Sequence, residues 1–538
     1  MKKFLSILTT IVFACGLFGA FPAAAAETTF ISGDYEYEVL EDGTASISIY
    51  NGSGDDITIP SDFDGHMVTA IGESAFYGCT SLTTITIPRN IVSIETYTFG
   101  ACFSLTEINV DEENPNYSSV DGVLFDKGIT SLLACPNGKT GDYTIPAGVK
   151  TIGGNAFRYC TSLTSVTIPD GVTSIGEEAF QFCDALTSVS IPDSITLIDK
   201  RAFYECSSMT EIIIPNSVTE IGNSAFGGCR SLTDITIPNS VTEINYQAFS
   251  SCTSLTSVTI PNSITSIGES AFDGCENLTE IVIPDSVTFI GESAFFGCEK
   301  LTEIVIPGSV TEMESETFSN CSNLTSVTLL EGVTEISYKA FNSCSLLTDV
   351  TIPNSVTYIS ENAFSYCTSL KNITIPDSVT YLGGSAFYNC ESLTEIIIPE
   401  SITEITYYTF RDCTSLTSVV IPDSVTEIEQ NAFEGCTNLT IYGNIGSYAE
   451  TYANENNIPF AEIGDEIVEP TKPAPGEAGS GDLDGDNEIG ITDIIAVAKI
   501  VHNQVSLTEE MFAAADLNSD NTVNAIDLSI IKYLLIKK

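Results

Sequence analysis

The stretch IPNSVTEIGNSAFGGCRSLTD, residues 214–234, contains the pattern that determines the fold, because the same motif repeats along most of the chain. Cysteines mark this motif every 23 residues, apart from one gap of 58 that contains an insertion of 35, and each has a phenylalanine three positions earlier. The marking cysteines are Cys79, Cys102, Cys160, Cys183, Cys206, Cys229, Cys252, Cys275, Cys298, Cys321, Cys344, Cys367, Cys390, Cys413 and Cys436. A fixed period of this length predicts a repeat architecture, in which each unit buries the apolar face of its neighbour.

The apolar spacing changes within one unit. In LTSVTIP, residues 163–169, Val166 and Ile168 alternate with polar residues, which is the period of a half-buried strand that Pro169 ends. Residues 217–221 predict a second short strand. Across residues 221–232 the apolar side chains recur every three or four positions, which predicts a short helical turn facing inward. The sequence therefore predicts an α/β solenoid with a parallel sheet on one face and short helices on the other.

The repeat, written L-x-x-[VI]-x-[IL]-P-x-x-[VI]-x-x-I-x-x-x-A/T-F-x-x-C, resembles the BspA-type (treponemal-type) leucine-rich repeat. We expect these repeats over residues 61–440. The resemblance implies a β-rich N-terminal cap at residues 27–60 and a closing unit with a short helix at residues 441–465. It also implies that the insertion at residues 111–146 is an irregular β-hairpin repeat. Members of this family are often secreted or surface binding proteins.

The two ends of the chain differ in composition from the repeats. Residues 1–26 combine Lys2 and Lys3 with an apolar run and small residues, as in a signal peptide. No later stretch is apolar enough to span a bilayer, so we expect a secreted, extracellular protein without membrane insertion. Residues 466–480 are rich in proline and glycine, which predicts an exposed linker to a small module at residues 481–538.

The C-terminal module opens with GDLDGDNEIGITD, residues 481–493, a candidate calcium loop. A hard cation takes six to eight oxygen ligands from a loop that curls around it. The first loop offers the side chains of Asp482, Asp484, Asp486 and Asp493 and the carbonyl oxygen of Glu488. The second offers the side chains of Asp516, Asn518, Asp520, Asn524 and Asp527 and the carbonyl oxygen of Thr522. Acidic turns without metal are the alternative, but two aligned loops, each followed by an amphipathic run, favour two Ca²⁺ ions.

These loops differ from ordinary EF-hands, because no helix enters the first loop and Asp closes both. Duplicated loop–helix units of this kind resemble a dockerin module. The resemblance implies calcium-dependent docking onto a cohesin domain of a scaffoldin, in a cellulosome-like complex at the bacterial cell surface. The implied cohesin contacts are Ile491, Thr492 and Lys499 in the first copy and Ala525, Ile526 and Lys532 in the second. Since the two sets differ, a symmetric two-way binding mode is disfavoured.

Charge and composition exclude several function classes. The 538 residues contain 19 basic and 72 acidic side chains, a formal charge of −53 that repels nucleic acid and anionic membranes. With only two histidines, the repeats cannot build a Ser-His-Asp site. Glu280 and Glu303 fall in adjacent outward strand positions and could in principle serve a glycoside hydrolase, but an open column offers no pocket. We therefore expect no enzyme.

The cysteine column has two readings. One thiol per turn at a fixed inward position predicts a stack of small apolar residues in the core. Disulfide pairing or metal binding between neighbouring turns is the alternative, although the spacing of stacked turns is slightly long for an unstrained disulfide.

The outward strand columns are mainly hydroxyl and acidic residues, with apolar spots at Ile213, Val282, Val305, Ile397 and Val420. Such spots favour a face that binds a protein or cell-surface partner. A carbohydrate-binding subunit of a polysaccharide-degrading complex is the alternative; because Trp is absent, tyrosine would have to supply its aromatic platform.

Overall fold

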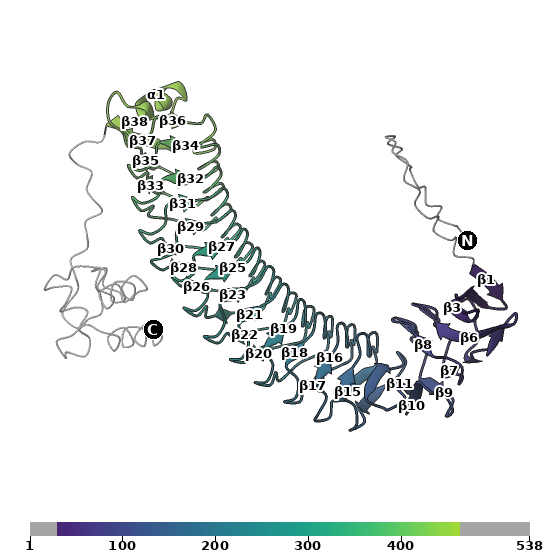
Figure 1. Cartoon of the computed structure of the whole chain (residues 1–538). Coiled ribbons are helices and arrows are strands. Elements are labelled where there is room, and N and C mark those ends of the chain that lie inside the picture. The colour runs from purple at the N-terminus through teal and green to yellow at the C-terminus, as the bar shows by residue number, and fades with distance from the viewer. Residues whose placement is uncertain (1–28, 463–538) are drawn as a thin grey trace, which may run out of the picture. The chain divides into compact units, whose positions relative to one another are not determined.

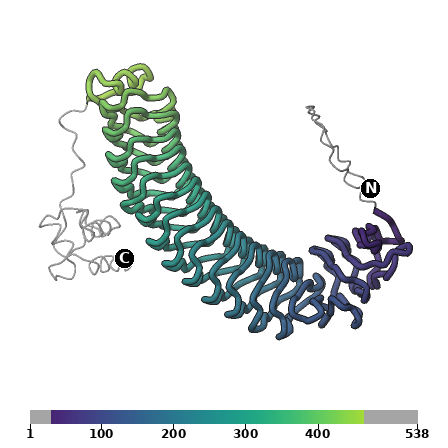
Figure 2. The backbone as a smooth tube through the Cα atoms, in the orientation of Figure 1, coloured from purple at the N-terminus to yellow at the C-terminus, as the bar shows by residue number. Residues whose placement is uncertain are grey.

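The computed structural model describes residues 29–462, so the predicted signal peptide, calcium ligands and cohesin contacts all lie outside the described residues. Residues 29–461 belong to one compact unit. Its turns stack along a curved path, and each turn of the main repeat brings two strand positions and a set of tight turns into line with its neighbours (Figures 1 and 2).

The N-terminal part of the unit begins with an antiparallel ribbon. Strands β1 (Thr29–Ser32), β2 (Tyr35–Val39) and β3 (Ala45–Tyr50) pair in order. Strand β3 then pairs in parallel with β6 (His66–Ile71), which also contacts β5 (Asp62–Phe63) and β8 (Ser93–Ile94). A separate parallel sheet contains β4 (Asp56–Thr58), β7 (Thr84–Ile87) and β9 (Glu107–Val110).

The insertion at residues 111–146 contains a hairpin, as the sequence resemblance implied. Strands β10 (Tyr117–Val120) and β11 (Val123–Asp126) are antiparallel, and β12 (Ser131–Ala134) pairs with β11. Strand β12 then pairs in parallel with β14 (Thr151–Ile152), and β13 (Gly141–Thr144) pairs in parallel with β15 (Leu163–Thr167). The insertion thus starts both strand ladders of the main repeat array.

The first ladder is built from the LTSVTIP segments. Val166 and Ile168 are buried and Thr167 is exposed, which confirms the predicted alternation. Strand β17 (Ser188–Ser190) completes the sheet that β13 and β15 begin. The ladder continues through three further groups of parallel strands: β20 (Asp234–Thr236), β22 (Ser257–Thr259) and β24 (Glu280–Ile281); β26 (Glu303–Ile306), β28 (Ser326–Leu329) and β30 (Asp349–Thr351); and β33 (Glu395–Ile397), β35 (Ser418–Val420) and β37 (Thr440–Gly443).

The second ladder consists of the two-residue strands predicted around residues 217–221. It contains four sheets of parallel strands. The first sheet contains β14, β16 (Ser174–Ile175), β18 (Leu197–Ile198) and β19 (Glu220–Ile221), together with β10–β12, and the second contains β21 (Glu243–Ile244), β23 (Ser266–Ile267), β25 (Phe289–Ile290) and β27 (Glu312–Met313). The third contains β29 (Glu335–Ile336), β31 (Tyr358–Ile359) and β32 (Tyr381–Leu382), and the fourth contains β34 (Glu404–Ile405) and β36 (Glu427–Ile428).

The last turn of the array is covered by helix α1 (Tyr448–Glu455) and strand β38 (Phe460–Glu462), which pairs with β37. Ser447 caps the helix by accepting a hydrogen bond from the backbone N–H of Glu450. The Tyr452 ring packs edge-on against Phe433, the last phenylalanine of the repeats. The closing unit therefore shields the end of the core from water.

The short helices predicted for residues 221–232 and their equivalents are absent from the described part of the chain, where α1 is the one helix. The segment is a run of hydrogen-bonded turns: the N–H groups of Ala225 and Gly227 donate to the carbonyls of Gly222 and Ser224, three residues back. Ser224 (φ 54°) and Gly228 (φ 74°) adopt the left-handed conformation, which a right-handed helix cannot contain. The inward positions are nevertheless as predicted, since Ala225 and Cys229 are fully buried.

Stacked phenylalanines and cysteines form the interior of the main array. From Phe157 to Phe433 successive rings stack nearly in parallel, with centroids 4.7 to 5.7 Å apart. From Cys183 to Cys436, each column thiol donates a hydrogen bond to a phenylalanine carbonyl of the preceding turn; Cys275 Sγ, for example, lies 3.3 Å from the oxygen of Phe249. All sixteen cysteines of the described residues are free thiols, which supports the core reading of the column.

Candidate binding surfaces

Most outward positions of the first ladder are exposed or half-buried, as the sequence predicted, but Ser326 is buried. Glu280 and Glu303 begin β24 and β26, and both side chains face solvent. A glycosidase needs an enclosed carboxyl whose pKa is raised by its surroundings. An exposed pair on an open sheet face does not meet that requirement.

Four of the five apolar spots of the first ladder are exposed, whereas Val420 is half-buried. Ile213 and Val282 have exposed fractions of 80% and 78%, and Ile397 has 60%. Each of these follows an exposed glutamate by two positions, as Val305 also does; the glutamates are Glu211, Glu280, Glu303 and Glu395. Isolated aliphatic side chains beside carboxylates can contribute to a protein interface, but they do not form a pocket.

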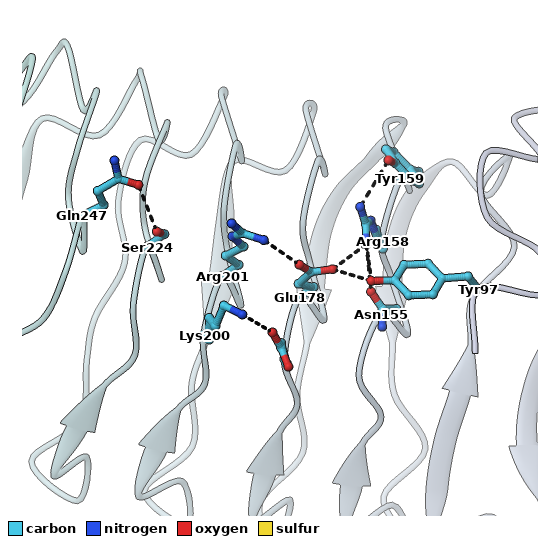
Figure 3. A network of polar contacts seen from close by, with 10 residues as sticks. Tyr97, Asn155, Arg158, Tyr159, Glu178, Lys200, Arg201, Ser224 and Gln247 are labelled. Atoms are coloured by element: carbon cyan, nitrogen blue, oxygen red, sulfur yellow. Dashed lines mark hydrogen bonds and ion pairs between the residues drawn. The ribbon is translucent and has the colours of Figure 1, made fainter. Parts of the chain in front are cut away.

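A polar network joins the N-terminal turns to the main array across the insertion (Figure 3). The Glu178 carboxylate accepts a 2.7 Å hydrogen bond from the Tyr97 hydroxyl and a 3.2 Å hydrogen bond from Arg201, and it forms an ion pair with Arg158. The Arg158 guanidinium lies over the rings of Tyr97 and Tyr159 at 4.7 and 4.9 Å. Sequence analysis did not predict this network.

The Glu178 side chain is only 9% exposed. Burial alone would raise the pKa of Glu178, but the hydrogen bond from Tyr97 and the charges of Arg158 and Arg201 outweigh it and lower that pKa. Because Tyr97 belongs to the N-terminal turns and Glu178 to the main array, the network is one of several contacts between the parts of the solenoid that contain the two hydrophobic cores; the Phe103 and Tyr159 rings, for example, also meet there edge-on. Its hydrogen bonds and ion pairs run among side chains of the solenoid itself, which indicates a structural role, although the buried Arg158 Nε has no partner.

The second ladder is interrupted at three places, between β19 and β21, between β27 and β29, and between β32 and β34. Where the ladder is continuous, a backbone N–H commonly makes the bond between turns; the N–H of Gly291, for example, donates to Ile267 O at 2.8 Å. At the interruptions a side chain donates to that carbonyl instead. These donors are Asn245 to Ile221, Ser337 to Met313 and Thr406 to Leu382. We call these three places the open steps.

A tyrosine follows the donor at every open step. Tyr246, Tyr338 and Tyr407 occupy the same repeat position, with exposed fractions of 41%, 38% and 45%. The corresponding sequences are INYQAF (244–249), ISYKAF (336–341) and ITYYTF (405–410). The open steps are therefore marked by the sequence signal I-[NST]-Y in place of I-G. Sequence analysis missed this signal because the repeat was defined by its regular cysteine and phenylalanine positions and not by the positions that vary between units.

A groove of about 280 Å³ lies at the second open step. Most of its lining residues carry hydroxyl or carboxylate side chains, and Tyr338 is the one aromatic residue among them. The lining residues are Val310, Thr311, Glu312, Met313, Glu314, Ser315, Val333, Thr334, Glu335, Ser337, Tyr338 and Ser360. We call it the step groove.

The structure carries two negative findings for residues 29–462. No group of three or more His, Cys, Asp or Glu side chains is placed there to hold a metal ion. In the same residues, no helix has both the length and the apolar character needed to cross a membrane.

The stacked 23-residue turns and their parallel ladders define a leucine-rich-repeat solenoid. The chain belongs to the family described as "BspA type Leucine rich repeat region (6 copies)", whose sequence model matches residues 49–127, 134–256, 242–368 and 334–455. The model of the dockerin type I domain matches residues 480–536. Both matches confirm the resemblances inferred from the sequence.

One solved structure supports this assignment. A leucine-rich repeat protein from Bacteroides ovatus is 30% identical, with 81% of this chain and 100% of that chain covered and a TM-score of 0.53. A leucine rich cell surface protein from Faecalibacterium prausnitzii is 27% identical, with 80% and 98% covered and a TM-score of 0.34. A search of curated proteins finds no match.

Proposed function

We propose that this chain is a secreted, non-catalytic binding protein that a dockerin attaches to the cohesin domain of a scaffoldin in a cellulosome-like complex. The observation that carries the proposal is the combination of two binding modules, a leucine-rich-repeat solenoid and a dockerin type I domain, in one chain. Neither module is catalytic. The solenoid binds a protein or cell-surface partner while the dockerin holds the chain in place.

Two Ca²⁺ ions organise the proposed dockerin. The first is held by Asp482, Asp484, Asp486, Glu488 and Asp493, and the second by Asp516, Asn518, Asp520, Thr522, Asn524 and Asp527. Calcium binding and folding are coupled in such loops, because the ligands converge only in the folded state.

The proposed cohesin-binding surface contains an apolar isoleucine in each copy, which suits the dry centre of an interface. Its residues are Ile491, Thr492, Lys499, Ala525, Ile526 and Lys532. The proposed borders are 1–26 for the signal peptide, 27–60 for the N-terminal cap, 61–440 for the repeats, 441–465 for the C-terminal cap, 466–480 for the linker and 481–538 for the dockerin.

An array of immobilised cohesin domains tests this proposal. The full chain is expected to bind at least one cohesin in calcium and none in EDTA. Changing both Ile491 and Ile526 to Asp is expected to abolish binding in calcium, whereas changing the exposed Ile213 of the solenoid to Asp leaves it intact. Retention that persists in EDTA contradicts the proposal.

A further inference from the structure

We propose that the step groove and the tyrosines beside it bind a neutral polysaccharide chain. This inference rests on the proposed function only in assigning a binding role to the solenoid, and it is independent of cohesin docking. The proposed ligand of this face is a glycan, whereas the sequence alone was compatible with either a glycan or a protein ligand.

The groove results from a local change in how two turns join. Ser337 donates its hydroxyl to Met313 O, and the strand ladder is interrupted between β27 and β29 at that point. In closed steps the equivalent residue is often glycine; a Cβ on Gly291 would lie 2.5 Å from the backbone nitrogen of Glu269, so the turns there are in tight contact. The volume of about 280 Å³ is close to the lower end, about 300 Å³, of the range usual for ligand pockets.

Aromatic surface continues from the groove along the solenoid. Tyr338 borders the groove, and the neighbouring strand column places Glu335, Tyr358 and Tyr381 in register on successive turns. The rings of Tyr358 and Tyr381 stack with centroids 4.3 Å apart, and the Tyr381 hydroxyl donates to Glu361 at 3.1 Å. Lys339 Nζ lies 5.0 Å from the centroid of the Tyr338 ring, and Tyr358 and Tyr381 cover each other's facing sides. The ring faces that are left attract the weakly positive C–H groups of a sugar, while hydroxyls and carboxylates beside them bind its O–H groups.

The charges of the groove select the class of ligand. Glu312, Glu314 and Glu335 take part in none of the ion pairs found within residues 29–462, and the nearby Lys339 is paired with Glu316 at 3.0 Å. Burial, together with the charges of Glu314 and Glu361, raises the pKa of Glu335. Such a set of acceptors repels anions and favours a ligand rich in hydroxyl donors.

Two other ligand classes fit the groove less well. A metal ion is disfavoured because no group of three or more ligating side chains converges anywhere in residues 29–462. A protein partner usually meets a patch whose centre is depleted of charged residues, whereas carboxylates line this groove itself. A neutral glycan has O–H groups that donate to the carboxylates and C–H groups that pack against the tyrosine rings.

The other open steps extend the site along the same face. Tyr246 precedes Tyr338 by four repeats, and Tyr407 follows it by three. With a strand spacing of about 4.8 Å, these tyrosines lie at distances of about 19 and 14 Å along the array. A long polysaccharide can contact more than one of them, whereas a short oligosaccharide would contact only the step groove.

Affinity electrophoresis of the full chain tests the proposal, with gels containing mixed-linkage β-glucan, arabinoxylan, glucomannan or, as an anionic probe, polygalacturonate. At least one neutral polysaccharide is expected to retard the chain, and polygalacturonate is not. Tyr338→Ala is expected to weaken retardation about tenfold. Ser337→Gly, which restores the residue found at closed steps, is expected to weaken it similarly while leaving every tyrosine in place. Tyr448→Ala, on α1, removes an equally exposed ring away from the groove and is the control.

The result that overturns the proposal is the absence of retardation by all three neutral polysaccharides. Retardation that Tyr338→Ala and Tyr448→Ala reduce equally overturns it as well, as does a protein ligand whose capture depends on Tyr338. The same preparations are assayed for cohesin binding in calcium. Since that assay reports on the dockerin alone, a chain without substitutions that binds cohesin but none of the neutral polysaccharides counts against the step groove and not against the proposed anchoring.

Discussion

At the scale of single residues, the cysteine column illustrates how position determines chemistry. Burial raises the pKa of column thiols such as Cys275 and Cys344 well above the usual range, so they remain protonated and unreactive. Cys79, at the first repeat, is only partly buried, and a hydrogen bond from Cys102 lowers its pKa. The same residue type is thus expected to be inert in the array and more reactive at its beginning.

We predict that, among the cysteines of residues 29–462, iodoacetamide labels Cys79 much faster than any other in the native protein. Peptide mass spectrometry after timed labelling measures this directly, and labelling in denaturant provides the reference in which all sixteen react. Rapid native labelling of Cys275 would show that the column is accessible.

Glu178 provides a second prediction at the residue scale. Glu178→Gln removes the charge that faces Arg158 and Arg201, and we expect a loss of about 2 kcal/mol in the free energy of unfolding at pH 7. Because the pKa of Glu178 is lowered in the folded state, its contribution is complete above the unfolded value of about 4.3 and disappears as the pH falls below it. The difference between the two proteins therefore shrinks in acid.

Urea unfolding followed by circular dichroism at pH 7 and in acid measures this difference. The control is Glu177→Gln, the neighbouring residue, whose exposed ion pair with Lys200 contributes about 0.5 kcal/mol or less. Equal effects of the two substitutions would mean that the network does not stabilise the junction between the two cores.

At the scale of elements, the strands could be predicted from sequence and the turns could not. Alternation of Val166 and Ile168 with polar residues determines which face of β15 is buried, so the strand and its orientation were correct. In residues 221–232 the inward residues recur as on a helix, but that spacing arises from left-handed residues at Ser224 and Gly228. A left-handed serine leaves no clear mark on a sequence, because the bonds between neighbouring turns are what hold it there.

Close approach of neighbouring turns gives a prediction for the closed steps. Gly291→Ala would place its Cβ 2.5 Å from the backbone nitrogen of Glu269, and we expect a loss of about 2 kcal/mol in stability because backbone atoms cannot move aside locally. Gly148→Ala is the control, since its nearest atom, Ile129 O, is 3.6 Å away. Thermal unfolding of both variants tests this, and an unchanged Gly291→Ala protein would show that the turns are not in tight contact.

At the scale of the whole molecule, the repeat period alone identified the solenoid, and the paired acidic loops identified the dockerin. The open steps carry a signal in the sequence, but the step groove itself could not be predicted, because it depends on which carbonyl the Ser337 side chain reaches. The anchoring module and the binding surface lie in separate parts of the chain, since the proposed calcium ligands begin at Asp482 and the described solenoid ends at residue 462. Each function is therefore expected to be lost by substitutions that spare the other.

The central claim, that the C-terminal module anchors an otherwise independent solenoid, is tested most directly by size-exclusion chromatography with light scattering. The full chain is mixed with a cohesin that it binds on the array, and residues 27–465 serve as the comparison. We predict a one-to-one complex of the full chain in calcium, no complex in EDTA or with Asp493→Ala/Asp527→Ala, and no complex for residues 27–465 in either buffer. A complex formed by residues 27–465, or a full-chain complex that survives EDTA, would contradict the account.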